Sequence, residues 1–529
     1  MNDRHGSSRS LKYLLYGFLV LSLLIGFFYF LKWWPEQNPN VLLISIDTLR
    51  RDHCTPYGYE RNTTPSLKML AEQGAVFDLA YSPSASTAPS HVTMLTSLYP
   101  IGHQVLDNGW ILTEKAYTLA EHLGAHGYQT AAFVSSSVLD KKFGFAQGFT
   151  FFDDDFSSSK STVYQKLWDD LPEGLDRRAD DTTRKVINWL KQHRDPDQPF
   201  FLFIHYFDPH DPYVPPKEIL SKLRPKGKRL TKLENQILKY DGEIMFTDRE
   251  IGKLLGTLEQ LGLKENTLVV VTSDHGEGLG QHDHMYHSIN IYEEQVRVPL
   301  IFRYPAGIPS GSRFSEPVEL VDLIPTILDL SNVTSKGFSS QGQSLAKALR
   351  GKATLDANRP VYLYRKKFKG HCRKDLSGKP IWLDGDKYGI RWENWKYIEG
   401  MAEKTRELFN FAEDPFELKN ITGTNPGKGI ELSSHIKDWK KQKFRHEADD
   451  SVISDEDLNR LKALGYIADA RHNTDEATNK DSDKDGVKDY LDNCPCVGNR
   501  EQGDNDGDGF GDLCDDAPDD PNSPPTPAD

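Results

Sequence analysis

The sequence predicts an α/β fold, in which a largely parallel sheet is covered by helices, and two observations support this prediction. Three short, continuous apolar runs, 40–46, 200–207 and 267–272, are typical of strands that are buried on both faces of a parallel sheet. Segments with a helical pattern alternate with these runs along the chain. The length of 529 residues allows three or four domains, or one large domain with appendages.

The first element along the chain is a predicted transmembrane anchor. Residues 13–31 form an uncharged, mostly apolar run of about 19 residues, close to the length that spans ~30 Å of hydrocarbon. Basic residues precede this run and two tryptophans follow it. We therefore expect 1–12 to be cytoplasmic, 13–34 to be a membrane anchor, and the catalytic part of the chain to be periplasmic or extracellular. A cleaved signal peptide is the alternative, but its apolar region is usually shorter and small residues follow it.

Helical patterns come next, between the predicted strands. Thr64 and Pro65 open one segment with an N-cap residue and a first-turn proline, and Gly74 closes it. A second segment carries an apolar stripe from 244 to 261 and ends at Gly262. These helices would cover the sheet of a main domain, 38–355.

The chain beyond residue 355 predicts a smaller α+β subdomain, 356–467. Short segments of alternating character, such as 360–364 and 387–398, suit antiparallel strands, and 458–464 has the pattern of a closing helix. Residues 468–480 are polar and are interpreted as a linker. Most of the net charge of −14 lies beyond this point, so the body of the chain is nearly neutral and we expect no nucleic-acid partner.

Polar side chains follow two of the predicted strands where each strand ends. Asp47 ends the first run, and Asp274 and His275 lie just past the third. Ligands bind outside the carboxyl ends of strands in open α/β sheets, and carboxylate and imidazole groups suit a divalent cation. Taken singly, Asp47 could cap a helix and His275 could be a core histidine. Histidines are also dense nearby, at positions 282, 284 and 287.

A candidate nucleophile precedes another helical pattern. Thr87 lies shortly before the apolar helical stretch 92–98, where a hydroxyl would meet the positive end of the helix dipole. A cation at that place would lower the pKa of the hydroxyl further. The alternative is that Thr87 merely caps the helix.

Several motifs together resemble the sulfatase family of the alkaline-phosphatase superfamily. They are NVLLISIDTLRRD (40–52), TAPSHVTMLTSLYP (87–100), FLFIHYFDPHDPY (201–213), TSDHGEGLGQH (272–282), YEEQVRVPLIF (292–302) and LVDLIPTILDL (320–330), followed by a pattern at 396–420. The resemblance covers 38–467. It implies an alkaline-phosphatase-like sheet sandwiched by helices, with a smaller C-terminal α+β subdomain and, in this chain, an added N-terminal transmembrane helix.

Four departures separate this sequence from the pattern of the family. The signature of sulfatases begins with a Cys or Ser that is oxidised to formylglycine, and here that position is Thr87, whose Cβ already carries a methyl group. The arginine expected four places later is His91, and the second aspartate of a family pair is Thr48. A segment that would supply a lysine and a histidine is replaced by VSSSVLD at 134–140.

The resemblance implies a role for each candidate residue. Asp47, Asp274, His275 and the Thr87 oxygen would bind zinc or manganese, with calcium less suited. Thr87 would then attack a phosphate ester as in the phosphodiesterase and transferase branches of the superfamily. His210 would bind substrate, His287 would bind the ester oxygens or protonate the leaving group, and His91 would replace the arginine on a substrate oxygen. Whether Asp208 or His282 recruits a second metal stays open.

Two other functions remain as alternatives. One is hydrolysis of sulfate esters by an atypical nucleophile, and in either case the ester could be linked to a lipid or a glycan. The other is a non-catalytic surface protein that mediates calcium-dependent adhesion.

The acidic tail carries two copies of a calcium-loop spacing. Carboxylates at places 1, 3, 5, 9 and 12, with glycine at place 6, can wrap one ion. The predicted ligands are Asp481, Asp483, Asp485, Asp489 and Asp492 in the first copy, and Asp504, Asp506, Asp508, Asp512 and Asp515 in the second.

The segment 481–515 resembles a thrombospondin type 3 repeat, and 516–529 would be a disordered end. Outside the cytoplasm one disulfide is expected among Cys494, Cys496 and Cys514. Pairing of Cys494 with Cys514 is favoured and would leave one thiol over. Cys54 and Cys372 are expected to be buried thiols.

Overall fold

The computed structural model describes most of the chain. The described residues are 38–156, 176–374, 376 and 380–442, together with 481, 483–488, 492–494, 496–505, 511–514 and 519 in the tail. Asn40–Asp529 form one compact unit, so the predicted boundary at residue 355 stays a prediction.

The prediction of a single-pass membrane protein requires correction. Across the described ranges, no helix combines the length and the apolar character needed to cross a membrane. The predicted anchor, 13–34, lies outside the described residues, as do the predicted closing helix, 458–464, and the linker, 468–480.

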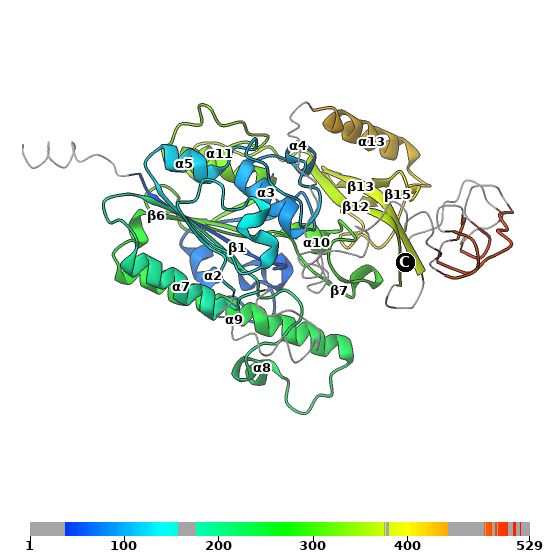
Figure 1. The fold of residues 1–529 in the computed structure, drawn as a ribbon, viewed down its shortest axis with the longest axis horizontal. Helices are drawn as coiled ribbons and strands as arrows, with labels where there is room; N and C mark the ends of the chain where they lie inside the picture. Colours follow the sequence, from blue (N-terminus) through cyan, green and yellow to red (C-terminus); the bar gives the residue numbers. More distant parts are fainter. Residues whose placement is uncertain are drawn as a thin grey trace, which may run out of the picture. The chain divides into compact units, whose positions relative to one another are not determined.

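A nine-stranded sheet forms the centre of the molecule (Figure 1). Its strands run parallel, except that β10 is antiparallel to both of its neighbours and β9 is antiparallel to β2. The three apolar runs form strands of this sheet, as predicted, and the structure shows that these strands, β6, β1 and β5, are neighbours. In sheet order the strands are β11 (Ser312–Glu319), β2 (Ala75–Tyr81), β10 (Leu300–Arg303), β6 (Thr267–Ser273), β1 (Asn40–Ile46), β5 (Phe200–Tyr206), β3 (Gln129–Phe133) and β4 (Phe151–Asp153), with β9 (Arg297–Val298) beside β2.

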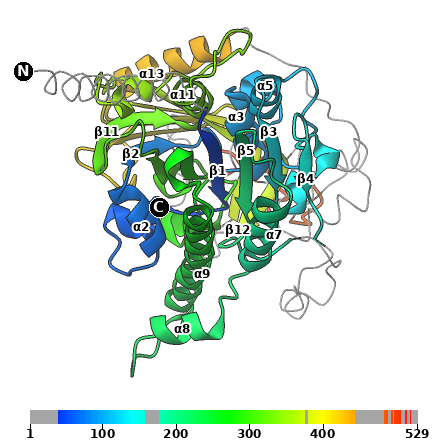
Figure 2. The ribbon, with the colours of Figure 1, turned by 90° about the vertical axis from the view of Figure 1, so that its left-hand side faces the viewer.

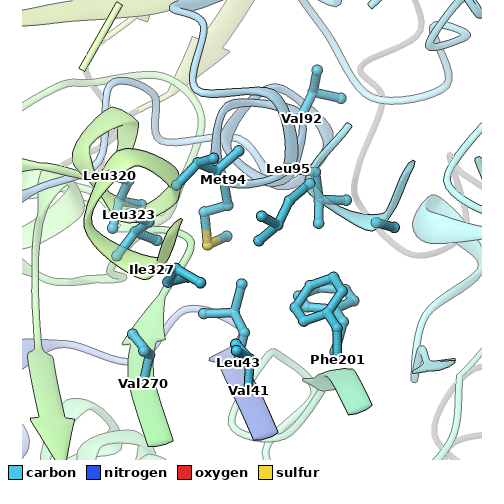
Figure 3. Close-up of a cluster of buried hydrophobic side chains, with 14 of the residues drawn as sticks. Val41, Leu43, Val92, Met94, Leu95, Phe201, Val270, Leu320, Leu323 and Ile327 are labelled. Atoms are coloured by element: carbon cyan, nitrogen blue, oxygen red, sulfur yellow. The ribbon is translucent and has the colours of Figure 1, made fainter. Parts of the chain in front are cut away.

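Helices cover both faces of this sheet. Side chains alternate between the two faces along each buried strand, so each face presents apolar side chains that helices bury. Val41 and Leu43 of β1 belong to one apolar cluster, whereas Leu42 and Ile44 belong to another. One face carries α3 (Thr87–Thr96), α5 (Leu119–Ala125) and α11 (Leu323–Leu330), and the other carries α2 (Pro65–Glu72), α7 (Ala179–Gln192) and α9 (Lys232–Gln260) (Figures 1 and 2). Figure 3 shows Met94 of α3 pointing toward the β1 side chains.

Two predicted helices differ in detail from the sequence pattern. The expected N-cap of α2, Thr64, makes no cap hydrogen bond, and the carboxylate of Asp248 on α9 instead accepts from the N–H groups of Ser66 and Leu67. Helix α9 begins well before residue 244, at a capping box formed by Thr231 and Glu234.

The segment beyond residue 360 forms a four-stranded antiparallel sheet, as the alternating pattern predicted. Helix α13 packs on it through Leu432, Ile436 and Trp439. Strand β12 also contacts the loop that follows β2, because Tyr364 N donates to Pro83 O at 2.7 Å. This contact holds the small sheet beside the loop that leads into α3. The elements are β12 (Val361–Lys374), β13 (Pro380–Trp392), β14 (Trp395–Gly400), β15 (Thr405–Asn410) and α13 (Pro426–Lys440).

Shorter elements complete the described part of the fold. They are the helices α4 (Pro100–His103), α8 (Lys217–Leu223), α10 (Glu293–Val296) and α12 (Ala346–Leu349), the hairpin of β7 (Gly278–Leu279) and β8 (Met285–Tyr286), and 3-10 turns at Arg51–His53, Thr55–Tyr57, Ser137–Leu139, Lys141–Phe143, Lys264–Asn266, Gln281–Asp283 and Leu320–Asp322.

The tail contains the favoured disulfide between Cys494 and Cys514. The expectation of one leftover thiol in this segment is wrong, because Cys496 is disulfide-bonded as well. Cys54 is a buried free thiol, as predicted.

The first predicted calcium loop is partly described. Ligand oxygens of Asp481, Asp483 and Asp485 lie within 4.8 Å of one another. Gly486 has φ +99°, the left-handed conformation that the sharp turn at place 6 requires. Of the other predicted ligands, Asp489, Asp506, Asp508 and Asp515 lie outside the described residues.

Candidate active site

The site lies where two neighbouring strands end at the same level. Ile46 of β1 pairs with Ser273 of β6, so Asp47 and the pair Asp274 and His275 leave the sheet side by side. Their ligand atoms all lie within 4.8 Å of one another, and all three side chains are fully buried. The structure therefore brings together the three cation ligands that the sequence predicted from two remote segments.

The electrostatics of this cluster favour a bound cation. Burial and the nearby Asp47 carboxylate raise the pKa of Asp274 above its usual range. Burial alone lowers the pKa of His275, but the Asp274 and Asp47 carboxylates outweigh burial and the pKa is raised. Within the described part of the chain, Asp274 Oδ2 accepts no hydrogen bond. Two buried carboxylates this close are costly unless a positive charge compensates them, so these residues fit a divalent cation.

Thr87 is the first residue of α3, and its hydroxyl faces this cluster. Its Oγ1 lies 3.2 Å from His275 Nε2, and the side chain is fully buried. The helix begins at Thr87 and not near Val92, because Pro89 falls in the first turn, where a backbone N–H needs no intrahelical partner. The capping alternative for Thr87 does not hold. Ser86 occupies the N-cap position, and Asn108 Oδ1 accepts from the Ala88 N–H at 2.8 Å.

His91 lies one helical turn after Thr87 and is fully buried. Its Nδ1 donates to Thr87 O at 2.8 Å, and its Nε2 lies 2.9 Å from Ser45 Oγ. Burial lowers the pKa of His91 to about 3, so the ring is neutral near pH 7. With both ring nitrogens bonded to the protein, the geometry favours a role in positioning Thr87. The predicted contact of His91 with a substrate oxygen would require one of these bonds to break.

His205 is part of the site, although it lies inside a strand and not at a strand end. It lies on β5, paired with Ser45, and its Nδ1 accepts from the Ser135 N–H at 3.3 Å. A neutral ring then carries its proton on Nε2, which lies 3.3 Å from Asp47 Oδ2. Burial lowers the pKa of His205 to about 4. The ring thus lies beside the carboxylate of a candidate cation ligand, without a hydrogen bond between them. A single histidine inside the apolar run FFLFIHYF was the available signal.

His210 and His287 lie beside the cluster from different loops. The His287 ring centroid is 4.4 Å from that of His275 and 5.0 Å from that of His210. His210 Nδ1 donates to Asp211 O at 2.6 Å, and burial lowers the pKa of His210 to about 3. Both predicted substrate-binding residues therefore lie next to the cation ligands.

Comparison with known proteins identifies the family. A family model described as Sulfatase matches residues 39–333, more than half of the chain. The chain belongs to the sulfatase family. A second model, described as the C-terminal part of N-sulphoglucosamine sulphohydrolase, matches residues 280–443.

Relatives and solved structures agree with this assignment. The chain is 24% identical to an N-acetylglucosamine-6-O-sulfatase of Bacteroides thetaiotaomicron, over 78% of this chain and 88% of the relative. It is 26% identical to an arylsulfatase of Clostridium perfringens, over 74% and 92%. A solved structure of a protein in complex with its substrate D-glucosamine-2-N,6-O-disulfate superposes with a TM-score of 0.62 at 23% identity, covering 77% of this chain and 98% of that chain. A phosphonate monoester hydrolase of Agrobacterium radiobacter gives 0.62 at 20% identity, covering 76% and 95%. The fold is thus the mixed α/β sulfatase fold.

Two departures from the sulfatase pattern have structural roles here. Thr48 adopts φ +56°, an uncommon conformation for a β-branched residue, and its N–H donates to Asp274 Oδ1 at 3.2 Å. The backbone at this position therefore orients a cation ligand, where the family pattern has a second carboxylate. Ser135, in the segment that replaces a lysine and a histidine, supports His205 through its N–H and through its hydroxyl, which donates to His205 O at 2.6 Å.

His282 and Asp208 do not join the cluster. His282 lies 2.9 Å from Glu294 Oε1 and stacks on Tyr292 at 3.9 Å between ring centroids. Asp208 Oδ2 accepts from Ala179 N at 2.7 Å, at the start of α7. Both side chains have structural contacts, which do not favour a second metal at either.

Proposed function

We propose that this sulfatase-family protein is a cation-dependent ester hydrolase or transferase that acts on phosphate esters, with Thr87 as its nucleophile. The observation that carries the proposal is the position of the Thr87 hydroxyl, 3.2 Å from His275 Nε2 in a buried Asp and His cluster. A hydroxyl at the first turn of a helix also meets the positive end of the helix dipole. Attack by this oxygen would give a covalent ester on Thr87, which water or an acceptor alcohol then resolves.

The identity of the nucleophile favours phosphorus over sulfur. Threonine cannot be converted to the aldehyde that sulfatases make from Cys or Ser, because its Cβ carries a methyl group. Thr87 offers a single side-chain oxygen, so an ester formed on it has to be opened by attack on phosphorus or sulfur itself. Direct displacement of this kind is the chemistry of phosphodiesterases. Sulfate esters are the second candidate, because the names of the relatives favour them. Two of the similar proteins have names that point to sugar sulfates as the substrate class.

The cation would be held by Asp47, Asp274 and His275, with the Thr87 oxygen beside them. Zinc or manganese suits this mixed oxygen and nitrogen set better than calcium does. When bound, the ion would supply Lewis-acid stabilisation of the charge that builds on the transferring group.

The remaining residues would position the reactants. His91 holds the Thr87 backbone and thereby the direction of the hydroxyl. His210 would contact ester oxygens, and His287 would bind the ester or give a proton to the departing alcohol. These roles follow from the rings lying 5.0 Å apart beside His275.

The test compares two substrates that share one leaving group and one charge: methyl 4-nitrophenyl phosphate and 4-nitrophenyl sulfate. We expect the higher kcat/KM with the phosphodiester, loss of turnover with a chelator, and recovery with zinc or manganese. Rapid quenching and peptide mapping should find a methylphosphoryl group on Thr87, and Thr87→Val should form no adduct. Faster turnover of the sulfate would overturn the phosphate preference. Absence of turnover with either ester, in the cation-loaded protein, would favour the non-catalytic alternative.

We also propose that the tail binds calcium. The convergence of Asp481, Asp483 and Asp485 oxygens supports this, together with the buried position of Asp492. Burial and the neighbouring carboxylates of this group raise the pKa of Asp483. A bound Ca²⁺ would relieve that repulsion.

A further inference from the structure

A buried carboxylate connects two aromatic side chains at the edge of the candidate site. Glu277 comes two residues after His275 and is fully buried. Its Oε1 lies 3.1 Å from His287 Nδ1, and its Oε2 accepts from Tyr213 OH at 3.0 Å. Neither Glu277 nor Tyr213 forms a hydrogen bond with the candidate nucleophile.

The donors around Glu277 determine which nitrogen of His287 carries a proton. The Tyr213 hydroxyl and the Gly278 N–H both donate to the Glu277 carboxylate. Burial raises the pKa of Glu277 to about 8, and these two donors favour its ionised form. In that ionised form Glu277 accepts the Nδ1–H of His287 as a third hydrogen bond. The His287 ring therefore has a fixed orientation, and any contact that it makes with substrate is through Nε2.

His287 is slightly more exposed to solvent than the cation ligands. Asp47, Thr87, Asp274 and His275 are 0% exposed, whereas His287 is 8% exposed. In an in-line displacement the leaving group departs on the side opposite to the nucleophile. For His287 to act on the leaving oxygen, the alcohol has to depart past this ring.

We infer that Glu277 and Tyr213 are positioning residues that hold His287 with Nε2 aimed at the leaving oxygen, so that His287 is the proton donor to the departing alcohol. This inference rests on the proposed ester chemistry at Thr87. In the first half-reaction the Thr87 oxygen, after its proton has passed to solvent, bonds to phosphorus and the bond from phosphorus to the leaving oxygen breaks. The electron pair of that bond stays on the leaving oxygen, which takes the proton from His287 Nε2. In the second half-reaction the oxygen of a water bonds to phosphorus, the bond from phosphorus to the Thr87 oxygen breaks, and Nε2 takes a proton from that water, so the Thr87 oxyanion and the protonated His287 are both restored.

The dependence of the rate on the leaving group separates this role from a structural one. A good leaving group such as 4-nitrophenol needs little protonation, whereas phenol needs more, so loss of a proton donor slows phenyl esters selectively. A residue that merely supports the fold or binds the phosphate would change both rates by the same factor.

The experiment measures kcat/KM for methyl 4-nitrophenyl phosphate and methyl phenyl phosphate in the cation-loaded protein. We expect Glu277→Gln to slow the phenyl ester about 10- to 100-fold and the nitrophenyl ester less than about threefold. Tyr213→Phe, which removes one donor to the carboxylate, should shift the ratio in the same direction by a smaller factor. His287→Ala should show the largest selective loss.

Glu294→Gln is the matched control, because Glu294 forms a similar partly buried pair with His282 at 2.9 Å, outside the cation cluster. It should leave the ratio of the two rates unchanged. Equal losses on both esters in Glu277→Gln and Tyr213→Phe would overturn the inference, and a Thr87 adduct in those variants would still uphold the proposed nucleophile. If the wild-type protein cleaves only sulfates, 4-nitrophenyl and phenyl sulfate replace the diesters, with the same two outcomes. No turnover of any of the four esters would overturn both proposals.

Discussion

Replacement of Thr87 by valine and by serine separates its proposed chemistry from its packing. Valine keeps the shape of the side chain and removes the oxygen, whereas serine keeps the oxygen and removes a methyl group. We expect Thr87→Val to lower kcat/KM at least about 10³-fold, because the covalent route is lost. That factor corresponds to about 4 kcal/mol of activation free energy.

The cost of these changes to folding should be much smaller. Thr87 is fully buried, and its hydroxyl has His275 Nε2 at 3.2 Å. Loss of one such hydrogen bond costs about 1 kcal/mol, and loss of one buried methyl group costs about 0.8 kcal/mol. Each variant should therefore lose roughly 1 kcal/mol of the free energy of unfolding, which is too little to explain a 10³-fold loss of activity.

The assay measures initial rates with the nitrophenyl diester, bound cation by elemental analysis, and urea unfolding for both variants. Thr87→Ser should keep activity within about tenfold, which corresponds to less than 1.4 kcal/mol. The mass of the serine variant has to be checked, because the family signature begins with a Cys or Ser that can be oxidised. Activity of Thr87→Val within tenfold of wild type, with the cation retained, would refute Thr87 as nucleophile.

Three further outcomes follow from other parts of the structure. His205→Phe should weaken the site's cation affinity about 10- to 100-fold in a chelator competition, because the His205 Nε2–H lies 3.3 Å from the Asp47 carboxylate and favours its ionised form, and unchanged affinity would contradict that role. Burial raises the pKa of Asp248 to about 6 from 3.8, so the folded state holds this proton more tightly than the unfolded state does. The protonated Asp248 side chain therefore adds to the free energy of unfolding below about pH 4, and this contribution is lost as pH rises to about 6. The change amounts to about 3 kcal/mol, at 1.36 kcal/mol per pKa unit. Asp248→Asn should make the urea midpoint depend less on pH over that interval. An unchanged dependence of the midpoint on pH would contradict this assignment to Asp248. Calcium should protect the tail from proteolysis and Asp483→Asn should reduce that protection, whereas equal protection by magnesium would argue against a calcium site.

The positions of the strands and the cation ligands could be predicted because the deciding signals are local. Continuous apolar runs indicate strands that are buried on both faces, and a polar residue at the end of such a run lies at the edge of the sheet. Asp47 and Asp274 satisfy both conditions, and parallel pairing of β1 with β6 brings them together. The antiparallel character of the small sheet was equally visible in the alternation of 387–398.

The positioning residues could not be predicted, because their roles depend on contacts between remote segments. His205 becomes a neighbour of Asp47 through pairing of β5 with β1, and a histidine in an apolar run does not show which strand it faces. Glu277 acquires its role from Tyr213, which lies on a different loop. His282 shows the opposite case, since its place in a histidine-rich segment suggested a ligand and its ring packs on Tyr292 instead.

The substitutions in this site change the charge that a substrate would meet. Where the family pattern has an arginine and lysines, this chain has the neutral ring of His91, the ring of His287 and the serine-rich segment 134–140. An anion in this site would then be attracted mainly by the cation and by the N-terminus of α3, and fewer positive charges favour an ester with one negative charge over one with two. A phosphodiester and a sulfate ester each carry one negative charge, whereas a phosphate monoester carries up to two. On the proposed chemistry, this lower positive charge would leave a site that accepts a diester, and the single oxygen of Thr87 would then favour the diester over the sulfate.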